Sequence, residues 1–245
     1  MSSPASSYVD AQTALTEMVR AGLMQAAARA GTDPAVAVQR LTVAAAALVR
    51  SLGPVAGQQA ARYYSAVRAE HSLRAPFRPA PASPAAPDVV ARNVDWALHD
   101  LLQRGDLGSS VQKLTGSVDR MVLDTGRDTI TGAVEQDPQA RAWARSIGLS
   151  ACSFCAMLAT RGAVYKEDSF RRSDRKFSGK VSTIKVHDHC HCFPTPVFGV
   201  YEPTAHVRRL QADWARVTKG RSGRDARLAW RQHIEGRIPA RPGGE

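Results

Sequence analysis

The sequence predicts a mainly α-helical protein: an N-terminal helical bundle, a helical middle segment, a small α+β module and a basic C-terminal helix. Three observations lead to this fold class. Apolar residues make up 44% of the 245 residues but aromatic residues only 6%, and alanine is frequent, which favours helices. One proline-rich stretch interrupts the helical pattern. All four cysteines lie in two short clusters, C-S-F-C and C-H-C.

Residues 1–75 are expected to form the N-terminal helical bundle. Three alanine-rich helices are predicted over 7–30, 33–51 and 54–75. The expected boundaries are Gly31, then Asp33 before Pro34, and finally Gly53 before Pro54, because proline and glycine usually mark helix ends.

Residues 76–87 are predicted to be a proline-rich linker, which would let the bundle and the rest of the chain move apart. Its prolines exclude a helix and favour an extended, semi-rigid spacer. Residues 88–135 follow as a helical connector, since apolar residues recur there at helical spacing.

Residues 136–202 contain both cysteine clusters and are predicted to form the α+β module. Thiolate and imidazole are the usual zinc ligands, and a structural zinc site takes four of them in a tetrahedron. Two short clusters separated by a polar loop therefore indicate a structural zinc site. The candidate ligands are any four of five residues: Cys152, Cys155, Cys190, Cys192 and His187.

Between the clusters, a basic loop is expected between short strands at 163–165 and 181–187, followed by an extended segment from Phe193. Other chemistries stay open at this point. A water in the fourth position would make the centre hydrolytic, with Asp188, Glu167 or Asp168 as base. Cys155 could instead be a nucleophile with His187 as its base. A disulfide or an iron–sulfur cluster is also compatible with four cysteines.

Residues 203–245 are predicted to be a basic helical tail. The chain carries a net charge of +11, and 10 basic against 4 acidic residues fall in this tail. Clustered cations attract polyanions, so non-specific contact with double-stranded DNA is expected. The candidate contacts are in the loop and the tail: Arg171, Arg172, Arg175, Lys176, Arg208, Arg209 and Arg216.

No stretch approaches about 18 uninterrupted apolar residues, so no membrane partner is expected. The N-terminal residues also lack the pattern of a secretory signal. A P-loop, a nucleotide-binding glycine motif and a serine elbow are absent from the sequence, and no residue is assigned as catalytic. A non-enzymatic role is therefore favoured.

Residues 140–201 resemble the Mu F-like minor capsid proteins of tailed phages, especially the actinobacteriophage branch. The resemblance rests on A-R-S-I-G-L-S-A-C-S-F-C-A-M-L-A-T-R-G-A-V-Y followed by K-V-H-D-H-C-H-C-F-P-T-P-V-F. The positions that match the family pattern are Cys152, Cys155, Arg161, Gly162, His187, Cys190 and Cys192. We therefore expect a Mu F-like module in which a structural zinc ion joins the two cysteine clusters.

This resemblance implies a head morphogenesis protein that is made in the host cytoplasm and becomes part of the virion. Its expected place is the portal vertex and the inner face of the capsid, in a few copies per head. The implied partners are the portal protein, the major capsid protein and packaged DNA. Relatives in the branch are often described as capsid maturation proteases, so a cysteine or metal-dependent peptidase is the alternative function. A zinc-ribbon regulator of transcription is a third hypothesis.

Overall fold

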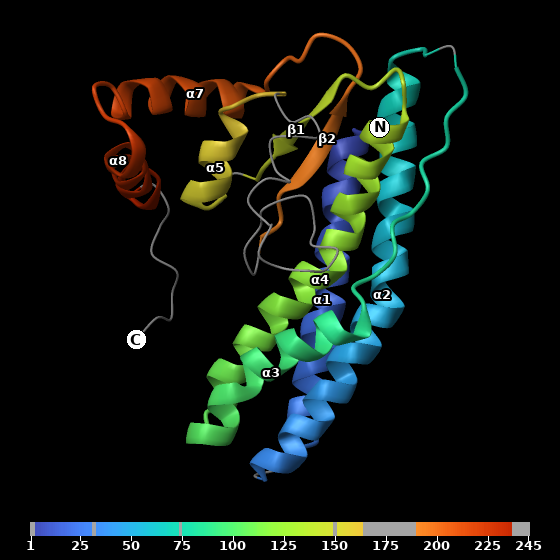
Figure 1. Ribbon diagram of the computed structural model, residues 1–245, viewed down its shortest axis with the longest axis vertical. Helices are drawn as coiled ribbons and strands as arrows, with labels where there is room; N and C mark the ends of the chain where they lie inside the picture. The colour runs from blue at the N-terminus through green and yellow to red at the C-terminus, as the bar shows by residue number, and fades with distance from the viewer. Residues whose placement is uncertain (1–2, 31–32, 74, 149–150, 164–189, 237–245) are drawn as a thin grey trace.

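A computed structural model describes residues 3–30, 33–73, 75–148, 151–163 and 190–236. The described chain is mainly helical and has a small two-stranded sheet. Four long helices form an elongated body (Figure 1). Their bounds are α1, Pro4–Ala28; α2, Pro34–Glu70; α3, Pro87–Arg104; and α4, Leu107–Gln136.

The core of this body is shared by helices from both sides of the proline-rich segment. Leu15 and Leu23 of α1, Leu41 of α2, Val94 of α3 and Leu114 of α4 belong to one buried apolar cluster. The packing therefore differs from the expectation of a separate bundle in residues 1–75. Apolar faces of α3 and α4 are buried against the first two helices, which removes apolar surface from water.

Helix α2 runs unbroken from Pro34 to Glu70 with Pro54 inside it, so the predicted division into helices 33–51 and 54–75 is wrong. Proline at this position removes one backbone donor and crowds the preceding turn. Buried residues flank it on the same helix, including Val49 and Ala56, both in the shared core. Tertiary burial on both sides outweighs the local preference for a break.

The proline-rich segment 76–87 contains no helix or strand before Pro87, and it runs along the body in Figure 1. Pro84 packs so closely on Gly53 that a Cβ added to this glycine would lie 2.9 Å from the Pro84 Cβ. The main-chain N–H of Ala82 donates to Thr129 Oγ1 of α4 at 2.9 Å. The segment is therefore anchored to α2 and α4, whereas its composition predicted a semi-rigid spacer that lets the parts it joins move apart.

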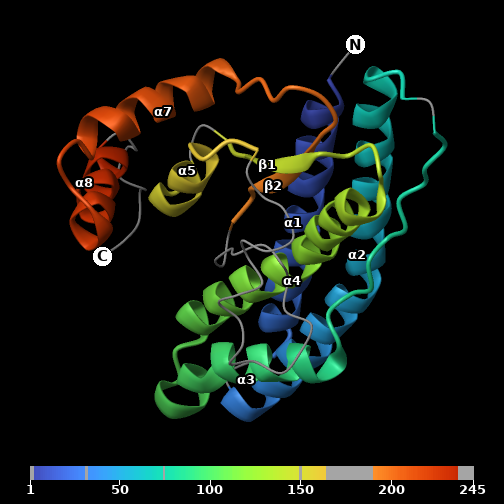
Figure 2. The same ribbon diagram turned by 45° about the horizontal axis from the view of Figure 1, so that its top comes forward.

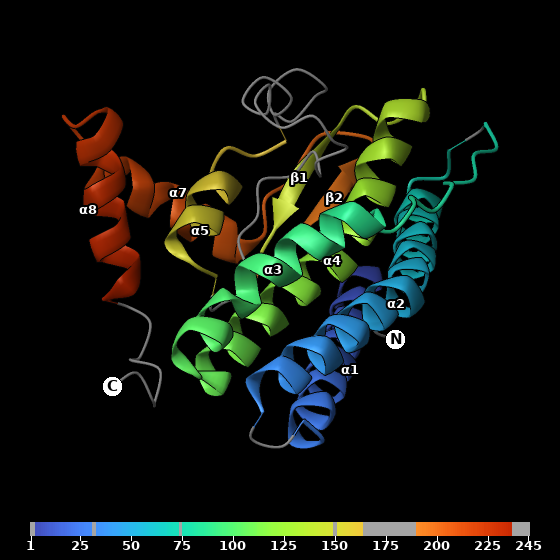
Figure 3. The same cartoon turned by 60° about the horizontal axis from the view of Figure 1, so that its bottom comes forward.

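Two strands connect the body to the remaining helices. Strand β1, Ala142–Ser146, pairs antiparallel with β2, Phe193–Val197, with Ala142 opposite Val197. The pair lies between α4 and α5 (Figure 3). Phe193 packs edge-on against the rings of Tyr8 and Tyr63, which fixes β2 to the body. The predicted strands at 163–165 and 181–187 lie outside the described residues, apart from Ala163.

Three short helices complete the C-terminal module: α5, Ser153–Ala159; α7, Ala205–Val217; and α8, Gly223–Glu235. They lie on the side of the molecule away from α2 (Figure 2). Leu158, Leu210 and Trp230 form part of their small apolar core. The Trp214 and Trp230 rings meet edge-to-face at 5.2 Å, which joins α7 to α8.

One described helix, α2, is long and apolar enough to cross a membrane by length and composition. Of its apolar stretch, 22% is buried inside the protein. Core helices of soluble proteins can have the same length and composition. The expectation from the sequence concerned uninterrupted apolar residues, and Arg40 and Arg50 interrupt the apolar residues of this helix.

Candidate metal centre

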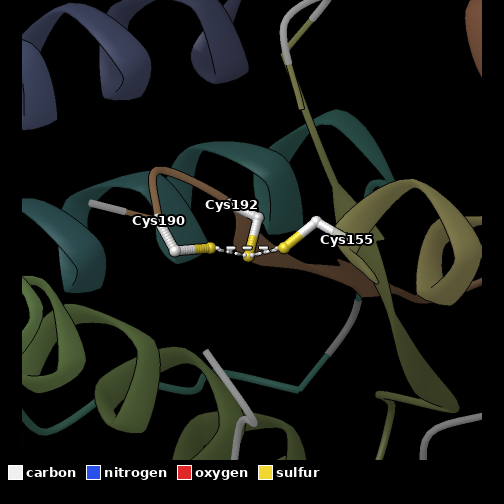
Figure 4. Close-up of side chains that lie close together, drawn as sticks. All are labelled: Cys155, Cys190 and Cys192. Carbon is white, nitrogen blue, oxygen red and sulfur yellow. Dashed lines mark hydrogen bonds between the residues drawn. The ribbon is translucent and has the colours of Figure 1, made fainter. Parts of the chain in front are cut away.

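The start of helix α5 and the residues that lead into β2 bring three cysteines together. The sulfur of Cys155 lies 3.3 Å from that of Cys190 and 3.5 Å from that of Cys192. The Cys190 and Cys192 sulfurs are 2.9 Å apart. All three side chains point toward one another (Figure 4). The C-x-C spacing thus directs both sulfurs to the same side, as expected for alternate residues of extended chain.

This trio, Cys155, Cys190 and Cys192, fits a thiophilic metal ion in ligand type and compactness. Its sulfurs all lie within 4.8 Å of one another, and each residue is at most 5% exposed. Two thiolates on a tetrahedral zinc, with bonds of about 2.3 Å, lie about 3.8 Å apart. The sulfurs need to separate by less than about 1 Å to reach that spacing. Three buried cysteines can therefore hold a metal ion.

The remaining predicted ligands differ in what the structure describes. Cys152 is half-buried at the N-cap of α5, where its sulfur accepts the main-chain N–H of Cys155 at 3.4 Å. It is adjacent to the trio but is not among the mutually close sulfurs. His187 lies outside the described residues, as do Asp188, Glu167 and Asp168. The choice of a fourth ligand stays a prediction.

Two buried arginines contact the trio, and sequence reasoning missed both. Arg145 of β1 donates through Nη1 to the sulfur of Cys192 at 2.7 Å. Arg127 of α4 donates through Nε to the main-chain carbonyl of Cys192 at 2.9 Å, and through Nη2 to that of Cys190. Arg127 also pairs with Asp124 at 2.7 Å.

A sequence signal existed for Arg145 alone. It stands among small and apolar residues in A-W-A-R-S, a setting in which an arginine is unusual unless paired. Arg127 gave no comparable signal, because its neighbours on α4 include Asp124 and Asp128 and resemble an exposed helix surface.

The electrostatics distinguish the three thiols. Hydrogen bonds with Cys152 above all, and also with Cys190 and Cys192, raise the pKa of Cys155. The bond with Cys155 lowers the pKa of Cys190, but the bond with Cys192 and burial outweigh it and raise that pKa to about 11. Hydrogen bonds from Cys155 and Cys190, assisted by the charges of Arg145 and Arg127, hold the pKa of Cys192 well below its usual range. Cys192 is thus the sulfur on which negative charge is best stabilised.

The predicted DNA-contacting residues fall into two groups. Arg208, Arg209 and Arg216 are exposed on α7, on the face opposite buried Val207 and Leu210. Arg216 pairs with Asp213 at 2.8 Å, and Arg208 donates to the Pro203 carbonyl at 2.6 Å. The loop residues Arg171, Arg172, Arg175 and Lys176 lie outside the described part of the chain.

Comparison with known proteins identifies the family. The family model described as VG15 protein matches residues 2–217, which is most of the chain. The chain belongs to the VG15 family. Gene 15 protein of Mycobacterium phage D29 is 32% identical to this VG15 protein over 132 residues, covering 44% of this chain and 48% of the relative. The chain therefore spans about half the length of that curated relative. No solved structure matches this chain.

Proposed function

We propose that this VG15 protein is a structural component of a tailed-phage virion, a minor capsid protein at the portal vertex and the inner capsid face. The observation that carries the proposal is family membership together with the similarity to a phage gene product. The resemblance of residues 140–201 to Mu F-like proteins supports the finer assignment. In this role the helical body would dock on the portal or the major capsid protein.

The proposed metal is zinc, held by Cys155, Cys190 and Cys192 with Cys152 or His187 as a fourth ligand. When bound, the ion would supply a tetrahedral crosslink between α5 and the residues leading into β2. The apolar core next to this centre is small and consists mainly of Ala156, Met157, Leu158, Leu210, Trp230 and Ile234. A structural ion would offset the limited burial, because small domains gain much of their folding free energy from bound metal.

A DNA-contacting role for the tail is supported by its charge. Arg208 and Arg209 are exposed on one helix, and further exposed arginines follow on α8, at 224, 227 and 231. Phosphate contacts of this kind act without sequence readout and weaken steeply with salt. Packaged double-stranded DNA is the polyanion that a protein of the inner capsid face would meet.

The alternative function is capsid maturation peptidase activity. The trio offers a poor nucleophile to a peptide, because its sulfurs are buried and directed at one another. A nucleophile has to reach the scissile carbonyl, with a base within hydrogen-bond distance. The geometry thus favours the architectural proposal over the peptidase.

The location is tested on purified particles. Virions of a phage that encodes this chain are separated on a density gradient after nuclease treatment, and their proteins are quantified by mass spectrometry. We expect the chain at a few copies per particle, and labelling of opened heads at one vertex. Recovery of the chain solely in the soluble fraction of infected cells would contradict the proposal.

The peptidase alternative is tested by the intact mass of the cognate major capsid protein, expressed with and without this chain. The architectural proposal predicts the same mass in both samples. A shorter product that appears with the wild-type chain and disappears with Cys155→Ser would establish the alternative. A scaffold protein co-expressed in the same way provides a second substrate.

A further inference from the structure

Two arginines, Arg145 and Arg127, lie at the candidate metal centre, although a buried guanidinium is among the most costly groups to take out of water. Arg127 is 0% and Arg145 is 1% exposed. Arginine stays protonated at any ordinary pH, so both positive charges persist inside the protein. Such charges are retained where an anionic group compensates them.

Their hydrogen bonds give the two arginines different roles. Arg127 donates to main-chain carbonyls of the C-x-C segment and to the carboxylate of Asp124. It therefore fixes the backbone of that segment to α4. Arg145 instead contacts sulfur: its Nη1 lies 2.7 Å from Cys192 Sγ and 4.0 Å from Cys155 Sγ.

We propose that Arg145 is a positioning residue of the metal centre, which orients the Cys192 sulfur and offsets the negative charge of the metal–thiolate group. This inference rests on the proposed metal centre. A divalent ion bound by three or four thiolates bears a net negative charge, and this one would be buried. A guanidinium that donates to one sulfur stabilises that charge at short range and selects one side-chain orientation.

The position of Arg145 in the sheet makes this role specific. The residue lies on β1 opposite Pro194 of β2, two residues beyond Cys192. The pairing of β1 with β2 therefore fixes the position of the guanidinium along the strand relative to the C-x-C segment. A shift in the β1–β2 register would remove the donor from the sulfur, so the sheet and the metal centre should form together.

The experiment uses the full chain with Arg145→Lys and Arg145→Gln. The lysine keeps the charge, whereas glutamine keeps a donor and loses the charge. Zinc affinity is measured by competition with a chromophoric chelator, and Co²⁺ provides the thiolate charge-transfer spectrum. We expect Arg145→Gln to weaken zinc binding by about 10- to 100-fold and to shift the charge-transfer band, since loss of a partner of a metal ligand has effects of this size. Arg145→Lys should recover part of both.

Arg68→Met is the matched control. Arg68 is also largely buried and pairs with Asp137 at 2.8 Å, but this pair belongs to a network without cysteine. Its loss should lower thermal stability and leave the Co²⁺ spectrum unchanged. If Arg145→Gln behaves like Arg68→Met, with reduced stability but unaltered zinc affinity and spectrum, the positioning role is overturned.

A measurement on the unmutated chain covers the case in which Arg145→Gln fails to fold. With ¹¹³Cd in place of zinc, a guanidinium N–H bonded to a metal-bound sulfur should show scalar coupling to the metal. Coupling at Arg145 would support the inference, and its absence in a cadmium-loaded, folded chain would overturn it. Failure of the wild-type chain to bind zinc, cobalt or cadmium would overturn the metal centre itself, which is a separate outcome.

Discussion

The helical body and the C-terminal module are stabilised by different means. The body, α1–α4, buries a large cluster made mainly of leucine, valine and alanine side chains, and a second cluster with several aromatic rings joins α1, α2 and α4 to β2. The module has a smaller apolar core and, beside it, a separate cluster of three cysteines contacted by two buried arginines. Apolar burial scales with the area removed from water, so the long helices of the body supply more of it than the short helices and two strands of the module.

This contrast shows where each region obtains its stability and specificity. Leu41 and Leu114 need no partner beyond close packing, and each is 0% exposed. Arg145 and the trio need both charge compensation and exact orientation, because buried polar groups without partners are costly. The body should therefore fold without an ion, whereas the module should depend on one.

Metal removal tests the contrast most strongly. Chelation under reducing conditions should destabilise the module by on the order of 10 kcal/mol, the range of structural zinc sites. Hydrogen exchange should then show loss of protection in α5, β1 and β2, with α1 and α2 still protected. A Cys155→Ser/Cys192→Ser double variant is the control, since the chelator should not affect it further. Equal protection with and without metal would contradict a structural ion.

Asp119 gives the body a dependence of stability on pH. Burial raises the pKa of this α4 side chain from 3.8 to about 7. The folded state thus retains a proton that the unfolded state loses, so stability falls as the pH rises from about 4 to 7. Asp119→Asn should add up to about 4 kcal/mol at pH 8 and little at pH 4. Urea unfolding at both pH values measures the gain in free energy of unfolding. An equal gain at pH 4 and pH 8 would contradict a raised pKa of Asp119.

Two glycines of α4 test how closely the body is packed. A Cβ on Gly126 would lie 2.7 Å from the Tyr8 hydroxyl and 3.2 Å from the Ala56 carbonyl, whereas a Cβ on Gly132 would have no atom of another described element within 4 Å. Gly126→Ala should cost about 1–3 kcal/mol through overpacking. Gly132→Ala is the matched control and should stabilise the helix by up to about 1 kcal/mol. Thermal unfolding measures the stability of both variants. Equal changes in stability would show that α4 does not pack closely on α1 and α2 at Gly126.

The smallest expected effect lies at the contact between the two regions. Tyr63 of α2 donates from its hydroxyl to Thr195 Oγ1 of β2 at 3.0 Å. Tyr63→Phe keeps the ring that stacks on Tyr8 and removes this bond, which should cost about 1 kcal/mol. Ser65→Ala, which removes an exposed bond within α2, should have almost no effect on urea unfolding. If Ser65→Ala lost more stability than Tyr63→Phe, the Tyr63–Thr195 hydrogen bond would contribute nothing measurable to stability.

Local patterns predicted the helices better than their ends. The apolar period identified the body helices, and the stripe of Val207 and Leu210 identified α7. The break expected at Pro54 was wrong because propensity near one residue says nothing about the burial of the turns around it. Strand β1 was missed because four of its five residues are buried, on both faces of the strand, so the sequence shows no alternation of apolar and polar residues.

The sequence indicated three of the cysteines that the structure brings together, but it did not indicate their surroundings. Soft ligands at short spacings identify a metal site whatever the fold, because coordination chemistry fixes the residue types. Arg127 and Arg145 come from α4 and β1, and nothing local in the sequence relates them to the cysteines. Their roles depend on the burial that the fold imposes.

The sequence alone therefore determined the helical character, the composition of the cysteine clusters and the basic tail. These follow from residue type and short spacing. Only the tertiary structure decided that α1–α4 share one core, that the proline-rich segment lies anchored against it, and that two arginines reach the cysteines. Each of these depends on contacts between residues distant in the chain, whose free energy arises when water is excluded between them.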